Sequence, residues 1–306
     1  MTAGPQRREI RTAVVLTNPA AGGGRADHAA RRATARLRER GVEVLAVTGT
    51  DPQDAVRLAR EAVGRGVDVL AVAGGDGMIA LAIQALAGTD VPLGVVPAGT
   101  GNDHAREYGL PLNDPQAAAD VIADGHLVRV DTGRIDTADG ATRYFGSVLA
   151  AGFDSLVNDR ANRLRRPRGR MRYNLAIVLE LARLRPLPFR LVLEDGTVVD
   201  RPLTLAAVGN TRSYGGGMLI CPDADHADGL LDLTLVGAMP RRRLLRFFPT
   251  VFKGTHVRHP DVTCHRTARV RIESAGINAY TDGDLAGPLP AEVRVVPRSL
   301  SLLVPG

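Results

Sequence analysis

Residues 69–87 have the sequence VLAVAGGDGMIALAIQALA, and this stretch decides how the first half of the chain folds. The four apolar residues 69–72 are typical of a buried strand, and Gly74-Gly75-Asp76-Gly77 is a tight polar turn. Apolar residues then recur at helical spacing from 78 to 87. The stretch therefore predicts a strand, a glycine-rich turn and a helix in immediate succession, the unit from which parallel sheets are built.

The same alternation of short apolar runs and helical periods extends over the first 130 residues. We expect further strands at 13–16, 42–47 and 93–96, and helices at 27–40 and 54–63. Strands separated by helices imply right-handed crossovers and a mostly parallel sheet. In such sheets the ligand site lies beyond the carboxyl ends of the strands.

Three glycine-rich turns fall at those carboxyl ends. They are residues 18–24 (NPAAGGG), 74–77 (GGDG) and 97–103 (PAGTGND). Glycines let backbone N–H groups approach phosphate oxygens, and the helix N-termini that follow add positive potential. None of the turns has the Gly-Lys-Ser/Thr of a Walker loop or the Gly-x-Gly-x-x-Gly of a dinucleotide fold. Together the three turns predict a phosphate-binding site.

After about residue 131 the pattern changes to short apolar runs of period two. These runs lie at 190–194, 197–199, 203–208, 231–236, 270–272 and 293–296. Asp195-Gly196 between the first two is a strong hairpin signal, and a helical stretch at about 154–184 interrupts the strands. We therefore predict an α/β nucleotide-binding domain over 8–134 and a β-rich domain over 135–289. The last strand, at about 290–306, is expected to return to the first domain.

The composition narrows the class of protein. A chain of 306 residues with 44% hydrophobic content can bury a sizeable core. Its net charge of +6 favours anionic partners, although no tryptophan and only 4% aromatic residues argue against nucleic acid. Cys221 and Cys264 lie too far apart in sequence to suggest a disulfide framework, and residues 1–11 lack the apolar core of a signal peptide. A cytoplasmic protein is expected.

The ordered set of turns resembles the diacylglycerol kinase catalytic domain. The resemblance starts with Asn18-Pro19, 74–77 and 97–103. It continues through Asp131-Thr132-Gly133, Ala151-Gly152-Phe153-Asp154, Tyr214-Gly215-Gly216-Gly217, Pro222-Asp223-Ala224, Asp228-Gly229 and Asp282-Gly283-Asp284. A lone Gly-Gly-Asp-Gly also occurs in NAD kinases and phosphofructokinases, whereas this series covers almost the whole chain. The family includes soluble bacterial lipid kinases and sphingosine and ceramide kinases, and the mycobacterial and actinobacterial branch is the most similar.

The resemblance implies a kinase that uses ATP and Mg²⁺. The positions that match nucleotide-contacting residues of the family are Asn18, Pro19, Ala20, Ala21, Gly22, Thr48, Gly74, Gly75, Asp76, Gly77, Met78, Ile79, Ala80, Thr100 and Arg165. Asp76 is also implied to help hold Mg²⁺. A structural magnesium of bacterial relatives maps to Asp228 and the backbone carbonyls of Asp225 and Leu230. Met78 departs from the family, which commonly has threonine there.

The resemblance also implies the catalytic carboxylates. The family's general base is a glutamate in an Asp-Gly-Glu turn, and the matching residue here is Asp284. Its side chain is one methylene shorter, so the geometry must compensate if the carboxylate is to reach the acceptor proton. Asp131 is implied to lie in the active cleft between the two domains and to orient the acceptor hydroxyl.

Diacylglycerol is the membrane lipid substrate that the resemblance favours. Sphingoid bases, ceramide, monoacylglycerol and a soluble acceptor such as NAD are alternatives. A nucleotide-binding lipid sensor that lost turnover through Asp284 and Met78 is the non-enzyme alternative. Seven arginines between 160 and 172 favour peripheral contact with the anionic inner face of the cell membrane, although a solvated helix would explain them too. A homodimer is left open.

Two further expectations concern side chains outside these motifs. The seven histidines show no spacing suited to zinc, so we expect them on the surface or at helix caps. The segment 241–248 has the sequence RRRLLRFF. Its apolar residues Leu244, Leu245, Phe247 and Phe248 are expected to pack in the core, with membrane anchoring as the alternative.

Overall fold

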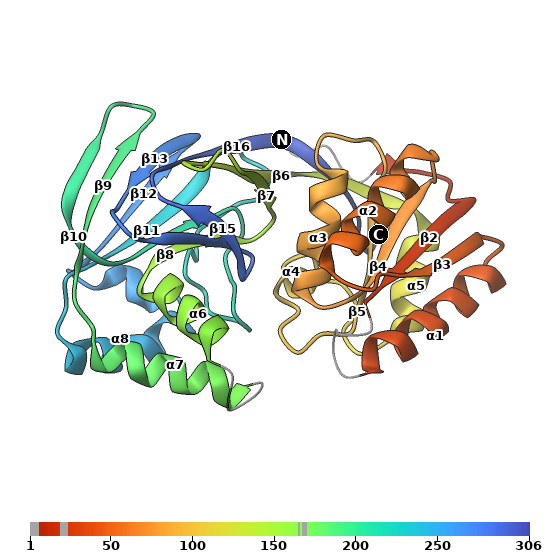
Figure 1. The fold of residues 1–306 in the computed structure, drawn as a ribbon. Coiled ribbons are helices and arrows are strands. Elements are labelled where there is room, and N and C mark those ends of the chain that lie inside the picture. The colour runs from red at the N-terminus through yellow and green to blue at the C-terminus, as the bar shows by residue number, and fades with distance from the viewer. Residues whose placement is uncertain (1–5, 19–23, 165, 167–169) are drawn as a thin grey trace. The chain divides into compact units, whose positions relative to one another are not determined.

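The computed structural model describes residues 6–18, 24–164, 166 and 170–306. The chain divides into two compact units. Figure 1 shows the chain coloured by residue number, from red at the N-terminus to blue at the C-terminus. Unit 1 consists of Met1–Thr132, His226–Gly229 and Val296–Gly306. Unit 2 consists of Gly133–Asp225 and Leu230–Val295. The short segment His226–Gly229 belongs to unit 1, which the sequence pattern does not indicate.

Unit 1 is built on a parallel sheet with the strand order β3–β2–β4–β5–β16. The strands are β2 (Thr12–Thr17), β3 (Glu43–Thr48), β4 (Val69–Gly74), β5 (Leu93–Pro97) and the end of β16 (Ala291–Leu303). The last strand enters beside β5, with Leu302 opposite Leu93. All residues of β4 and β5 are buried, as expected for strands that are covered by helices on both faces.

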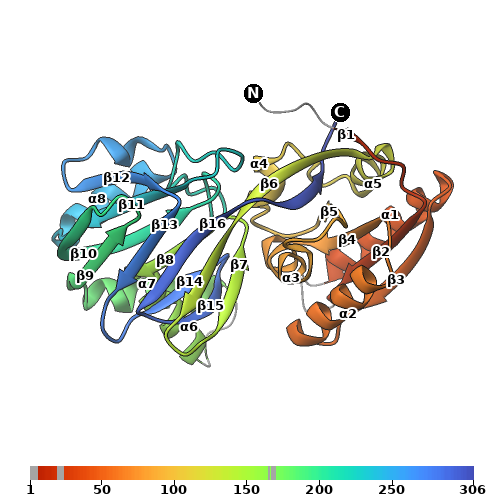
Figure 2. The ribbon, with the colours of Figure 1, turned by 90° about the horizontal axis from the view of Figure 1, so that it is seen from above.

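Helices cover both faces of this sheet. One face carries α1 (Arg25–Glu39) and α5 (Pro115–Asp124), and the other carries α2 (Pro52–Gly64) and α3 (Asp76–Leu86) (Figures 1 and 2). The starts of α2 and α5 follow one rule. An aspartate N-cap accepts backbone N–H bonds and a proline stands at the first helical position, at Asp51-Pro52 and at Asp114-Pro115. The remaining elements are the short α4 (Asp103–Glu107), and β1 (Gln6–Arg7), which pairs with β6 (His126–Thr137).

The order of the strands fixes where a ligand can bind. The chain runs from β2 to its neighbour β3, and then crosses back to β4 on the other side of β2. As a result, α1 after β2 and α3 after β4 leave on opposite faces of the sheet. Such a reversal opens a crevice at the carboxyl ends of the two central strands, which is where doubly wound folds bind their ligands.

Unit 2 is mainly antiparallel. Its sheet has the order β15–β14–β8–β10–β9–β13–β16, with β11 paired to β10 and β12 to β11. The bounds are β7 (Thr142–Phe145), β8 (Val148–Gly152), β9 (Leu187–Leu193), β10 (Val198–Gly209), β11 (Leu231–Gly237), β12 (Val262–Thr267), β13 (Arg269–Glu273), β14 (Asn278–Thr281) and β15 (Asp284–Pro288). β9 and β10 form the hairpin predicted from Asp195-Gly196, and Gly196 adopts the positive φ of 85° that its turn requires.

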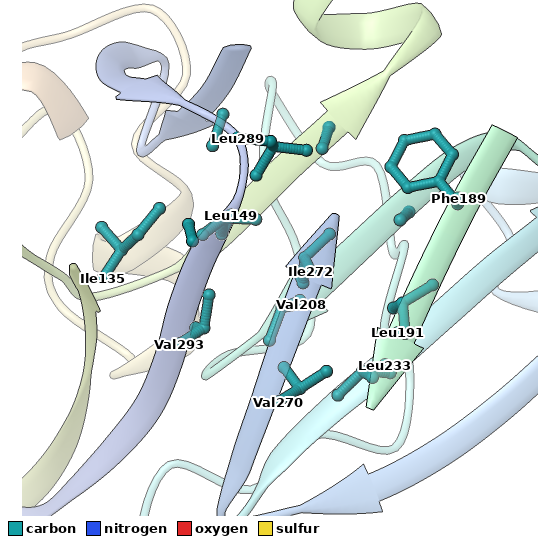
Figure 3. Packing of buried hydrophobic residues seen from close by; sticks show 14 of the residues in the cluster. Ile135, Leu149, Phe189, Leu191, Val208, Leu233, Val270, Ile272, Leu289 and Val293 are labelled. Carbon is teal, nitrogen blue, oxygen red and sulfur yellow. The ribbon is translucent and has the colours of Figure 1, made fainter. Parts of the chain in front are cut away.

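The core of unit 2 lies on the inner faces of these strands. Figure 3 shows how its aliphatic and aromatic side chains interlock, among them Ile135, Leu149, Phe189, Leu191, Val208, Leu233, Val270, Ile272, Leu289 and Val293. The helices of this unit are α6 (Phe153–Arg163), α7 (Arg170–Ala182), α8 (Arg241–Val251) and the 3₁₀ helix η2 (Thr255–Arg258). Of the helices in the described ranges, none is both long enough and apolar enough to cross a bilayer.

The predicted fold class is confirmed. The expected strands and helices of the first half correspond to β2, α1, β3, α2, β4, α3 and β5. One expectation about packing is wrong: Leu244 and Phe247 of α8 are buried, but Leu245 and Phe248 are 58% and 44% exposed. The buried and the exposed pair form two adjacent rows on one helix, and only the row with Leu244 and Phe247 packs into the core.

Gly133 of β6 offers a test of this packing. It pairs with Phe145 of β7, and a Cβ atom at residue 133 would lie 2.0 Å from the buried Phe145 ring. We expect Gly133→Ala to lower the free energy of unfolding by about 1–3 kcal/mol through overpacking, measured by urea denaturation. Gly64→Ala is the control, because nothing lies within 4 Å of its Cβ position in α2. Equal stabilities of the two variants would contradict this account.

Candidate active site

The strand register brings the strand ends that precede the predicted turns to one edge of the unit 1 sheet. Thr17 at the end of β2 is opposite Thr48 at the end of β3, and Gly74 of β4 is opposite Pro97 of β5. The hydroxyl oxygens of Thr17 and Thr48 lie 3.1 Å apart. The carboxyl ends of β2, β3, β4 and β5 therefore lie at the edge where the strand order predicts that a ligand binds.

The turns after β4 and β5 touch through their glycines. A Cβ atom on Gly99 would lie 2.4 Å from the Cα of Gly75, so no larger residue fits at position 99 without moving the backbone. Asn102 fixes the second turn: its side chain accepts a hydrogen bond from the Gly99 N–H (3.0 Å) and donates one to the Gly99 carbonyl (3.1 Å). Asn102 itself is left-handed, with φ of 57°. This clip sets the position of α4 directly after it.

Asp76 is the first residue of α3, and His104 of α4 contacts it. The Asp76 Oδ1 accepts the His104 backbone N–H (3.1 Å) and lies 3.3 Å from its Nδ1. Partial burial alone would raise the pKa of Asp76, but the hydrogen bonds and charge of His104 outweigh burial and lower this pKa to about 2. Asp76 is therefore ionised at any physiological pH. A quarter of its side chain remains exposed to solvent.

The donor set at this edge fits magnesium bound together with phosphates. Mg²⁺ prefers carboxylate oxygens and commonly binds through one or two carboxylates plus substrate phosphates. Asp76 supplies one permanently ionised carboxylate beside glycine-rich turns. Within the described ranges no three His, Cys, Asp or Glu side chains gather in a cluster that could hold a metal ion without such help.

The structure places the other predicted nucleotide residues in different surroundings. Gly77 and Thr100 are exposed and Asn18 is buried, whereas Pro19, Ala20, Ala21, Gly22 and Arg165 lie outside the described residues. Met78, Ile79 and Ala80 are buried on α3, so their side chains pack in the core of unit 1. Met78 packs against Gly74, where an added Cβ would lie 2.6 Å from its Cγ. The positions of Met78, Ile79 and Ala80 leave only their backbone for contact with a nucleotide.

Asp131 has a role in holding unit 1 together. Its carboxylate is buried, and it accepts the backbone N–H groups of Gly229 (2.8 Å) and Arg298 (2.7 Å). Its own N–H donates to the His226 carbonyl (2.7 Å). These bonds tie the segment His226–Gly229 and the end of β16 to β6. The exposed Asp228, one of the predicted metal ligands, lies within the segment so held.

Asp284 begins β15 of unit 2, directly after a turn that a neighbouring aspartate anchors. Asp282 accepts hydrogen bonds from the N–H groups of Gly146 and Ser147 and from the Ser147 hydroxyl (2.6–2.9 Å). Arg143 of β7 donates to the Leu285 carbonyl (2.9 Å), and its guanidinium lies 3.4 Å from the Asp284 carboxylate. Partial burial raises the pKa of Asp284, Arg143 opposes this effect, and the charge of Asp282 adds to it. The carboxylate remains about half exposed, as proton transfer from a substrate requires.

Unit 2 also contains a cavity of about 580 Å³ between α6, the region around the end of α7 and Gly276. Its walls combine apolar side chains with charged ones. The apolar residues are Phe153, Leu156, Leu164 and Leu184, and the charged ones include Arg160, Arg163, Arg183, Asp159 and Glu180. A lining of both kinds suits an amphiphilic ligand.

The sequence analysis did not predict the residues that shift the pKa values of Asp76 and Asp284. The expectation that histidines lie on the surface or at caps is wrong for His104, which is buried beside Asp76, and for the buried His256. The only sequence signal for His104 was its position directly after Asn102-Asp103. Arg143 and Asp282 lie 141 and 2 residues from Asp284, so only Asp282, inside the Asp282-Gly283-Asp284 turn, could have been suspected.

Comparisons with known proteins agree with this architecture. Residues 12–135 match the family model described as the diacylglycerol kinase catalytic domain, and residues 147–304 match the YegS C-terminal NAD kinase beta sandwich-like domain. A diacylglycerol kinase of Mycobacterium tuberculosis is 56% identical over 100% of this chain and 99% of the relative. A diacylglycerol kinase of Bacillus subtilis is 28% identical over 88% of each chain.

Solved structures show the same fold. A crystal structure of a diacylglycerol kinase from Bacillus anthracis superimposes with a TM-score of 0.72 at 19% identity, covering 98% of both chains. A second crystal structure from the same organism reaches 0.79 at 20% identity, covering 98% of this chain and 99% of the other.

The chain has an α/β unit, with glycine-rich turns where the strand order reverses, and a β-rich unit. Together with the match to the kinase catalytic domain, this fold defines a two-unit kinase that uses ATP. The chain belongs to the diacylglycerol kinase family, as its similarity along the whole length to the mycobacterial relative shows.

The pKa of Asp76 predicts a pH-dependent contribution to stability. Because this pKa is about 2 in the folded chain and 3.8 ordinarily, the contribution is fully present above about pH 5 and is lost as the pH falls toward 2. The stability difference between wild type and Asp76→Asn, measured by urea unfolding, should shrink over that range. His104→Ala, which keeps the backbone donor but removes the ring, should show a weaker pH dependence than wild type. A constant difference from pH 6 to about pH 2 would contradict the assignment.

Proposed function

We propose that this chain transfers the γ-phosphoryl group of ATP to the hydroxyl of diacylglycerol, forming phosphatidic acid. The observation that carries the proposal is the ionised Asp76 between two touching glycine turns at the crevice edge of unit 1. The name of the mycobacterial relative supports the choice of diacylglycerol. The mixed lining of the unit 2 cavity is in keeping with an acceptor that has both polar and apolar parts.

The proposal assigns nucleotide binding to unit 1. Backbone N–H groups at the start of α3 would contact the phosphates, and Asp76 would hold Mg²⁺ against them. When bound, the metal supplies charge neutralisation for the transferring phosphoryl group, which is the main demand of this chemistry. The turn 18–24, Thr48 and Thr100 complete the proposed nucleotide contacts, and Arg165 is proposed to face the phosphates.

Asp284 is proposed as the general base. Its carboxylate would accept the proton of the acceptor hydroxyl as that oxygen attacks the γ-phosphorus and the bond to the ADP oxygen breaks. A raised pKa makes a carboxylate a better proton acceptor at neutral pH, provided that it remains ionised. Arg143 favours the ionised form, and Asp282 fixes the turn, so the shorter aspartate side chain is held in one place.

Asp131 is proposed to hold backbone segments in place, and not to contact the substrate. Both of its carboxylate oxygens accept backbone N–H groups, so it orients the segment that carries Asp228. Asp228 and the carbonyls of Asp225 and Leu230 are oxygen donors, the kind that a structural magnesium requires. This second metal site remains a prediction from the resemblance.

Three alternatives follow from the same residues. Another lipid, such as a sphingoid base, ceramide or monoacylglycerol, could be the acceptor, and so could the soluble acceptor NAD. A nucleotide-binding sensor without turnover is the non-enzyme alternative. The carboxylate of Asp284 favours turnover, because a sensor has no use for a half-exposed base with a raised pKa.

A panel of acceptors offered with γ-labelled ATP tests the function. Purified protein is expected to label dispersed diacylglycerol faster than each of the other acceptors, with Mg²⁺ required. Asp284→Asn keeps the size of the side chain but cannot take a proton, so kcat should fall by at least about a hundredfold with little change in the KM for ATP. Asp284→Glu retains the charge and is expected to keep partial activity. Turnover by Asp284→Asn within a few-fold of wild type would remove Asp284 from the role of base.

Arg143 should shift the pH profile without taking part in the chemistry. Its positive charge lowers the pKa of Asp284, so Arg143→Gln should raise that pKa further. Because the base works only when ionised, the acidic limb of kcat against pH should move to higher pH in the variant. Arg190→Gln, an exposed arginine of β9 in the same unit, is the control and should leave the profile in place. An unchanged acidic limb in Arg143→Gln would show that Arg143 does not act on the base.

A further inference from the structure

The outer side of α8 carries apolar side chains that the core of unit 2 does not use. Leu244, Phe247 and Val251 face inward and are buried. Leu245 is 58% exposed, Phe248 44%, and Phe252, directly after the helix, 45%. At 3.6 residues per turn these three exposed residues project within about 60° of one another. They therefore form a continuous apolar row along the helix.

The aromatic residues make this row unusual for the chain. The protein has six phenylalanines and no tryptophan, and the two phenylalanines that are exposed are Phe248 and Phe252. Their rings pack edge to face with centroids 5.7 Å apart. Such an ordered pair exposed to water costs free energy unless a partner covers it.

Basic residues surround the row. Arg241, Arg242, Arg246 and Lys253 are all exposed, and no acidic side chain in the described part of the chain pairs with any of them. Arg243 alone has an acidic partner, Asp261 (2.8 Å). The sequence has no aspartate or glutamate between Asp232 and Asp261. The row of exposed apolar side chains is therefore flanked by four basic side chains that have no acidic partner among the described residues.

We infer that this α8 surface, made of Leu245, Phe248 and Phe252 with Arg241, Arg242, Arg246 and Lys253, docks unit 2 onto an anionic lipid bilayer. Helices that lie in the bilayer interface combine an apolar row with uncompensated arginine and lysine. The aromatic side chains would enter the boundary of the acyl chains while the guanidinium groups pair with lipid phosphates. The inference rests on the proposed function for its choice of a lipid, but it makes a separate claim about where the lipid surface is met.

The arginine run at 160–172 is a separate basic segment, and its contact with the membrane stays a prediction from sequence. Arg160 is engaged by Glu180 in an ion pair. Arg165 and Arg168 lie outside the described residues, and the side chains of Arg170 and Arg172 are not described either. On α8, Arg243 pairs with Asp261, whereas no acidic side chain among the described residues pairs with Arg241, Arg242 or Arg246.

Sedimentation with vesicles in the absence of ATP tests the inference. Wild-type protein should bind vesicles of phosphatidylcholine mixed with phosphatidylglycerol more tightly than phosphatidylcholine alone, and added salt should weaken this binding. The triple change Leu245→Ser, Phe248→Ser and Phe252→Ser should reduce binding to mixed vesicles by about tenfold or more. Changing Arg241, Arg242 and Arg246 to Gln should reduce binding by a similar factor and flatten its salt dependence.

Matched controls come from unit 1. Leu45 is 48% exposed on β3, so Leu45→Ser removes an exposed leucine elsewhere, and Arg60→Gln with Arg65→Gln removes exposed arginines of the α2 region. These variants should bind vesicles as wild type does, and thermal unfolding checks that every variant is folded. Binding by the α8 variants that equals the controls would overturn the inference. So would a wild-type dimer in sedimentation velocity that the serine variant converts to monomer, since the row would then be covered by a second copy.

Turnover measured separately distinguishes this inference from the proposed function. A short-chain diacylglycerol dispersed in water needs no bilayer, so the α8 variants should phosphorylate it at the wild-type rate while losing activity on mixed vesicles. Vesicle binding through α8 by a protein that phosphorylates no lipid would support the surface and reject the function. Full activity of the α8 variants on mixed vesicles would reject the surface and leave the function in place.

Discussion

The contact between the backbones of Gly75 and Gly99 constrains the whole edge of unit 1 at which we propose that the nucleotide binds. Because Gly74 pairs with Pro97, the two turns leave neighbouring strands at the same level, and only residues without side chains allow them to touch. The contact places α4 beside the first turn of α3, so that His104 reaches Asp76. The ionisation of Asp76 is thus a consequence of strand register and glycine placement, and a larger residue at position 99 would displace the histidine as well as the turn.

Two aspartates of the proposed site are shifted in opposite directions by their surroundings. Asp76 is the more buried of the two, yet its pKa falls because a backbone N–H and a histidine favour the charged form. Asp284 is more exposed, yet its pKa rises because partial burial disfavours the charged form and Asp282 adds a like charge, and these effects exceed the opposing effect of Arg143 at 3.4 Å. A metal-binding carboxylate needs permanent charge and a base needs proton affinity, so environments that separate the two pKa values suit the two proposed roles.

Periodicity in the sequence was enough to predict the parallel sheet, because β4 and α3 follow each other without a break and each has a pattern of its own. It was also enough to place the turns, since parallel strands end at one edge. Periodicity could not predict the contacts of Asp76 and Asp284, because His104 and Arg143 come from other elements and meet the carboxylates only after folding. The expectation for Leu245 and Phe248 was wrong for a different reason. Hydrophobicity predicts burial on average, but the sequence does not say which of two adjacent apolar rows on a helix meets the core.

The motif Asp131-Thr132-Gly133 shows why resemblance to a catalytic family does not by itself give each residue a chemical role. Asp131 holds two backbone N–H groups, the Thr132 hydroxyl meets that of Ser299 at 2.8 Å, and Gly133 makes room for the ring of Phe145. All three lie where β6 passes from unit 1 to unit 2, and each is needed there for packing or hydrogen bonding. A residue can therefore match a catalytic motif because the architecture requires it. The same test separates Asp284 from Asp131, because no backbone group uses the Asp284 carboxylate in the described structure and half of that side chain is open to a substrate.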